Sequence, residues 1–94
     1  MQVVIYVRQT DEISLYEQYN KCANFAKKYG YSISGKVLDF DGTHFHEAIN
    51  KVIVEHDIEA LMIYSKDMVF PKADDYLFYR IYLDKLGKGL ISIE

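Results

Sequence analysis

Cysteine and proline are almost absent from this chain of 94 residues, which contains one of each. Because a disulfide needs two thiols, Cys22 excludes a disulfide within the chain. Its place in a helical pattern predicts a small buried residue. Pro71 disfavours helix at Phe70 and therefore predicts a turn there.

Long apolar runs are missing as well. No stretch approaches the roughly 20 residues that span a bilayer. The apolar run at residues 3–7 lacks the basic flank, the length and the cleavage site of a signal peptide. We therefore expect a cytoplasmic protein without a membrane segment.

A basic surplus is also lacking. The net charge is −3 and the pI is about 5.5, which disfavours independent binding to polyanionic DNA. The five glycines are scattered, so no glycine-rich phosphate loop or dinucleotide fingerprint is present. His44, His46 and His56 lack the spacing of a ligand set. We expect no cofactor and no metal.

The composition is that of one globular domain over residues 1–94, with half of the residues apolar and no repeat or linker. Short apolar runs predict strands at residues 3–7, 33–38, 60–64 and 90–93. Apolar residues spaced by three and four predict helices at residues 15–29, 45–56 and 73–86. Ser14 with Glu17 forms a capping box before the first helix, and Gly30 and Gly87 end the first and third helices.

Strands that alternate with helices predict an α/β fold in three layers, with a four-stranded parallel sheet in the order 2-1-3-4. Functional crevices in such sheets lie beyond the carboxyl ends of the strands. The loops to examine are therefore residues 8–13, 39–44 and 65–72, and we expect the last of these to be without regular structure.

Several segments together resemble the catalytic domain of the resolvase/invertase serine recombinases. They are Ile5-Tyr6-Val7-Arg8 followed by Thr10, Ser14-Leu15 with Gln18, residues 25–31, residues 37–39, residues 61–67 and residues 86–93. Members of that family cut DNA by attack of a serine hydroxyl on a phosphodiester, with several arginines around the reacting phosphate. The resemblance implies a resolvase-like fold and a site that includes Arg8, Thr10 and Asp67.

The same residues depart from the family pattern where its chemistry lies. Thr10 stands where the family has its serine, or else one residue is deleted there. Asp67 matches the family aspartate, but Met68 and Pro71 occupy two positions where arginines are expected. Guanidinium groups stabilise the charge that develops on a phosphoryl group during transfer. Their loss indicates a degenerate active site.

Further departures follow at the second predicted helix and at the end of the chain. His46 takes the place of an arginine and Glu47 that of a proline, and the preceding loop has shrunk to residues 41–43. The chain also stops at the fourth strand, whereas family members continue into a long helix and a DNA-binding domain.

Large apolar side chains surround the third predicted helix almost completely, whereas a helix that covers one sheet face needs a single stripe. Aromatic residues are enriched at protein interfaces. We therefore predict an interface formed by Tyr76, Phe78, Tyr79 and Tyr82.

These patterns favour a catalytically inactive recombinase-like domain that associates with itself, with another recombinase or with a regulatory protein. The domain would bind DNA only weakly or through that partner. One alternative is a divergent recombinase that uses Thr10 with Arg8 and Asp67. A second is a small nucleic-acid-binding regulator with local patches at Lys27, Lys28 and Lys51. A third alternative is an acidic metal site, whose candidate ligands are the carboxylates Asp11, Glu12, Asp39, Asp41 and Asp67. We expect these residues to be solvated loop carboxylates instead.

Overall fold

Strands and helices alternate along the chain in a computed structural model that describes residues 1–94. The elements are β1 (Gln2–Arg8), α1 (Leu15–Lys28), β2 (Ser32–Asp39), α2 (Phe45–Val54), β3 (Ala60–Ile63), α3 (Lys66–Val69), α4 (Ala73–Lys85) and β4 (Gly89–Ser92). Every predicted strand and helix is present, with ends that differ by one or two residues.

The four strands are parallel and lie in the order β2-β1-β3-β4, which confirms the predicted topology. β1 is central, and its residues 3–7 are almost completely buried. Those residues are mostly β-branched and apolar on both faces, as a strand covered by helices on both sides requires.

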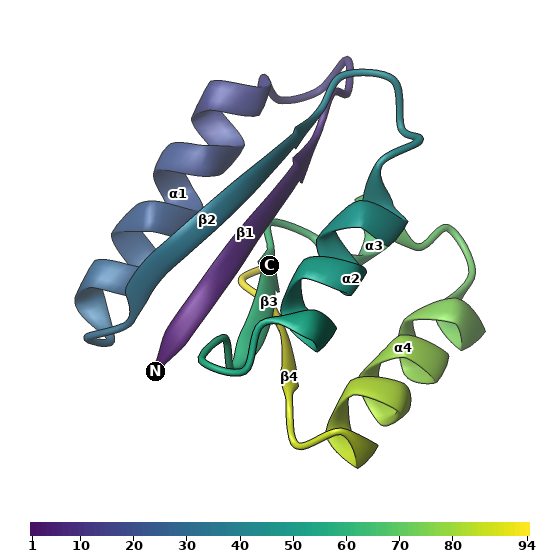
Figure 1. The fold of residues 1–94 in the computed structure, drawn as a ribbon. Helices are drawn as coiled ribbons and strands as arrows, with labels where there is room; N and C mark the ends of the chain where they lie inside the picture. Colours follow the sequence, from purple (N-terminus) through teal and green to yellow (C-terminus); the bar gives the residue numbers. More distant parts are fainter.

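Helices cover both faces of this sheet (Figure 1). α1 packs alone on one face, where Val3, Ile5 and Val7 meet its buried side. α2 and α4 cover the other face, where Val4 and Tyr6 join a larger core. The predicted three-layer arrangement is therefore confirmed. None of the helices combines the length and the apolar character that a membrane crossing requires.

Local signals in the sequence set the helix ends. The Ser14 hydroxyl oxygen accepts a hydrogen bond from the Glu17 amide at 3.2 Å, as the capping box predicts. Gly30 and Gly87 both adopt a φ of 74°, and backbone bonds close each helix end around them. This left-handed conformation is one that glycine adopts without steric cost.

Three local expectations are wrong. The segment 65–72 was expected to be irregular, yet α3 forms one helical turn there, because Pro71 restricts only Phe70 and leaves the residues before it free to coil. The spacing of apolar residues in the first predicted helix places Tyr29 on its buried face, but Tyr29 is 53% exposed because α1 already ends at Lys28. The same spacing leaves Gln18 off the buried face, yet Gln18 is buried and its side-chain amide donates to the Arg8 carbonyl at 2.6 Å.

Candidate functional site

A cleft lies beyond the carboxyl ends of β1 and β2. Arg8 ends β1, Asp39 ends β2, and the two residues are partners in the sheet register. The cleft has a volume of about 390 Å³ and is lined by Arg8, Gly42, Thr43, Phe45, His46, Val69, Phe70, Asp75 and Tyr79. Parallel sheets place ligand sites at this edge. Each of the three loops named from the predicted topology contributes residues that line the cleft.

Asp39 is fully buried and organises the turn that forms one wall of the cleft. Its Oδ1 accepts hydrogen bonds from the amides of Gly42 at 2.8 Å and Thr43 at 3.2 Å. Its Oδ2 accepts from the Tyr6 hydroxyl at 2.5 Å and from the His44 amide at 2.9 Å. A carboxylate offers about four lone-pair sites, so these donors occupy all of the hydrogen-bond acceptor sites of Asp39.

Tyr6 links this buried carboxylate to Arg8. Its hydroxyl donates to Asp39 and accepts a hydrogen bond from Arg8 Nε at 2.9 Å. Burial, and next the hydrogen bond to Asp39, raise the pKa of Tyr6 well above its ordinary value. The phenol therefore remains neutral, and its hydrogen bond orients the guanidinium of Arg8, which lines the cleft.

Arg8 supplies the only guanidinium of the cleft. Its Nη1 also donates to the Val69 carbonyl at 3.4 Å, so two of its nitrogens already have protein partners. The other arginine of the chain, Arg80, lines a separate groove beside β4. Asp75 also lines the cleft and brings a carboxylate to the same space as Arg8.

Thr10 and Asp67 are not among the residues that line this cleft. The Thr10 hydroxyl donates to the Ile13 carbonyl at 3.1 Å and accepts from the Ile13 amide at 3.3 Å. It is therefore engaged in a local turn. Asp67 is exposed on α3 and forms no side-chain hydrogen bond or ion pair. Of the three predicted catalytic residues, the structure places only Arg8 in the cleft.

Asp39, Asp41 and His44 bring three potential metal-ligand atoms within 4.8 Å of one another. Asp39 already has a donor for each of its lone pairs. Asp41 accepts from the Thr43 hydroxyl at 2.6 Å and amide at 3.0 Å, and these bonds lower the pKa of Asp41. The carboxylates of this cluster therefore serve to build the turn.

The predicted interface residues of α4 divide into two pairs. Tyr76 and Tyr79 are half-buried against the core, and the Tyr79 ring lies 5.2 Å from that of Phe45 between centroids. Phe78 and Tyr82 point outward, 61% and 41% exposed, with their rings stacked at 6.1 Å. Two further apolar residues of α4, Leu77 and Ile81, are 49% and 55% exposed.

The network of Tyr6 and Asp39 is the part of the site that sequence reasoning missed. Tyr6 was interpreted as one apolar residue of a buried strand. A phenol hydroxyl in such a strand needs a hydrogen-bond partner, and that requirement was the available signal. Asp39, at the end of the neighbouring strand, was the nearest acceptor by topology.

Comparisons with known proteins bear on the fold. No family model and no curated protein matches the sequence. Among solved structures, the crystal structure of the N-terminal catalytic domain of TP901-1 integrase is similar, with a TM-score of 0.78 and 21% sequence identity. The match covers 99% of this chain and 77% of that chain. Together with the sheet order, this similarity confirms the predicted fold: the chain has the fold of a serine recombinase catalytic domain.

Proposed function

We propose that residues 1–94 form one recombinase-like domain that does not cleave DNA and that acts by protein association in DNA recombination or its regulation. The observation that carries this proposal is the cleft itself, whose single guanidinium is tied to Tyr6 and to the Val69 carbonyl. The TP901-1 integrase domain, which shares the fold, is described as catalytic. This chain has the same fold, and its cleft contains one guanidinium.

Phosphoryl transfer by a hydroxyl needs a free nucleophile and several charges around the phosphate. The Thr10 hydroxyl is engaged by Ile13 and lies outside the cleft. Met68 is half-buried and Pro71 is exposed at the positions where arginines are expected. Loss of one stabilising donor slows such a reaction by about a hundredfold or more, and here several are missing together.

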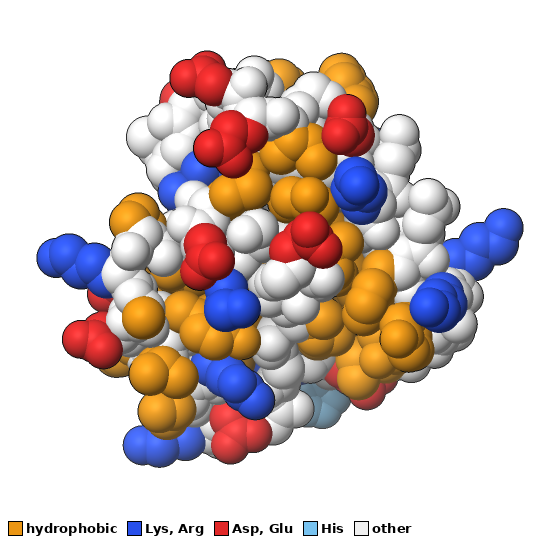
Figure 2. All heavy atoms as spheres, turned by 180° about the vertical axis from the view of Figure 1, so that it is seen from behind, with side chains coloured by type: hydrophobic (Ala, Val, Ile, Leu, Met, Phe, Trp, Pro, Cys, Tyr) orange, Lys and Arg blue, Asp and Glu red, His pale blue; other side chains and the backbone are white.

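The charge of the surface agrees with a role that does not depend on independent DNA binding. On the face shown in Figure 2, acidic and basic side chains are interspersed with patches of hydrophobic ones, and no continuous basic surface appears on that face. Free-standing DNA-binding domains gather Lys and Arg on one face. Contact with DNA would then come through an associated recombinase.

α4 provides the surface for association. Leu77, Phe78, Ile81 and Tyr82 expose large apolar side chains on one helix. Contiguous exposed apolar groups of this kind mark protein-binding sites. The partner is a second copy, an active recombinase or a regulatory protein of the same system.

Catalysis is tested by incubating the protein with a supercoiled plasmid library and trapping protein–DNA adducts with detergent. We expect no nicking and no adduct above the level of Thr10→Ala. An adduct that disappears in Thr10→Ala would overturn the proposal and establish a divergent recombinase.

Association is tested by light scattering. We expect a molar mass that rises with concentration in the wild type and much less in Ile81→Asp. The matched control is Tyr16→Asp, which places the same charge on α1 at a side chain that is 70% exposed. A wild type that stays monomeric and recovers no partner from cells would contradict this part.

A further inference from the structure

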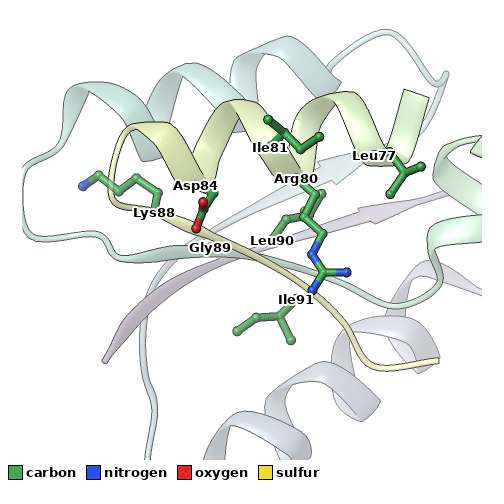
Figure 3. A pocket seen from close by; sticks show the side chains of 8 residues that line it. All are labelled: Leu77, Arg80, Ile81, Asp84, Lys88, Gly89, Leu90 and Ile91. Carbon is green, nitrogen blue, oxygen red and sulfur yellow. The ribbon is translucent and has the colours of Figure 1, made fainter. Parts of the chain in front are cut away.

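The outer edge of β4 is open and forms the wall of a groove with α4. β4 is the last strand of the sheet and pairs only with β3. The groove, about 500 Å³ in volume, is lined by Leu77, Arg80, Ile81, Asp84, Lys88, Gly89, Leu90 and Ile91 (Figure 3). Exposed strand edges pair readily with another strand.

The direction of the backbone groups shows which residues offer this edge. The amides of Gly89 and Ile93 donate to the carbonyls of Glu59 and Ile63, so they face inward, toward β3. Because backbone groups alternate in direction along a strand, those of Leu90 and Ser92 face outward. Leu90 and Ser92 therefore present a donor and an acceptor each, with no partner strand.

Two opposite charges flank this edge. In Figure 3 the Arg80 guanidinium reaches toward the Ile91 end of the strand, and Asp84 lies toward the Gly89 end. The two residues are four apart on α4, yet they form no ion pair with each other or with any other residue. Lys88 also lines the groove at the Gly89 end, but its ammonium group donates to the carbonyls of Glu55, His56 and Ile58. The side chains of Arg80 and Asp84 are therefore the charges of this edge that lack a protein partner.

We infer that two copies of this chain pair through antiparallel β4 strands, which extends the sheet across a two-fold axis. Leu90 then lies on the axis and exchanges backbone hydrogen bonds with Leu90 of the other copy. Ile91 of each copy lies opposite Gly89 of the other. This inference rests on the proposed function in that it names the partner of the α4 surface.

Charge complementarity selects the antiparallel arrangement. A two-fold rotation brings the Ile91 end of one strand to the Gly89 end of the other, so Arg80 of each copy faces Asp84 of its partner. The same rotation packs α4 against α4 and covers Leu77 and Ile81, which are about half exposed in the single chain. An unrelated extended peptide would satisfy the strand edge but not both charges.

Charge reversal tests the pairing. Arg80→Asp places like charges at both ends of the interface, and so does Asp84→Arg. Each variant alone should associate about tenfold more weakly than the wild type, or weaker, because symmetry repeats the unfavourable pair. An equimolar mixture of the two variants should associate again, since a chain with two carboxylates then faces a chain with two guanidinium groups.

Molar mass is measured by light scattering or sedimentation between about 10 and 500 µM protein, a range suited to dissociation constants in the micromolar region. Lys27→Asp and Asp57→Arg are matched controls that change charges of the same sign at exposed residues of α1 and of a loop. They should associate as the wild type does.

A wild type that is monomeric throughout this range would overturn the inference. So would single variants that associate normally, or a mixture that fails to recover. Ile81→Asp could abolish association while the mixture of Arg80→Asp and Asp84→Arg remains monomeric. That result would support the proposed role in association and contradict the pairing through β4. A covalent adduct between the protein and plasmid DNA would contradict the proposed non-catalytic role, but it would not affect the inference of pairing through β4.

Discussion

Replacement of Asp39 by alanine should remove much of the stability of the fold. The substitution leaves the fully buried Tyr6 hydroxyl without an acceptor and frees the amides of Gly42, Thr43 and His44. A buried donor without a partner costs about 1–3 kcal/mol, and each amide bond contributes about 0.5–1.5 kcal/mol, less where water replaces it. We expect a loss of about 3–5 kcal/mol, against a typical total of about 5–15 kcal/mol.

Urea unfolding followed by circular dichroism measures this loss, with Tyr6→Phe as the partner variant. Tyr6→Phe removes the hydroxyl but leaves Asp39 its three amide donors, so it should cost only about 1–2 kcal/mol. In the double variant no orphaned hydroxyl remains, and the combined loss should fall short of the sum by about 1 kcal/mol or more. An Asp39→Ala loss below about 1 kcal/mol, or strict additivity, would refute the reasoning.

Three further outcomes are expected. Burial raises the pKa of the Cys22 thiol to about 12, so a thiol reagent at about pH 8 should label the unfolded chain and not the native one; rapid native labelling would contradict this. The folded pKa of Tyr6 lies above the unfolded value of about 10, so its contribution to stability is complete below about pH 10 and is lost as the pH rises further; urea midpoints of Tyr6→Phe should fall less steeply above about pH 10. Tyr79→Ala should cost about 2–3 kcal/mol and Phe78→Ala less than about 0.5 kcal/mol, since only the Tyr79 ring packs into the core; equal losses in urea would contradict this division.

Much of the fold was predictable because its signals are local. A buried β-branched run at residues 3–7 and a capping box at Ser14 identify β1 and α1 without knowledge of the rest. Right-handed crossovers limit the possible orders of the strands, and the order 2-1-3-4 was chosen among them. α3 was missed because four residues are too few to show a helical period.

The site was less predictable because its contacts join distant residues. Tyr6 and Asp39 are 33 residues apart, and only the parallel pairing of β1 and β2 brings them together. On α4 the apolar residues surround the helix, so no period distinguishes Tyr79, which packs inward, from Phe78, which points outward. The resemblance implies a site that includes Arg8, which lines the cleft, but the neighbours of Arg8 emerged only from the structure.

Asp39 holds the turn at residues 42–44 through main-chain amides and not through side chains. Every residue except proline supplies such an amide, so the anchor places no demand on the side chains of Thr43 and His44. Cleft-facing side chains can therefore be exchanged while the turn stays in place. His46, which lines the cleft, is one such position, and an arginine there would add a second guanidinium to the cleft without removing an anchor of the turn.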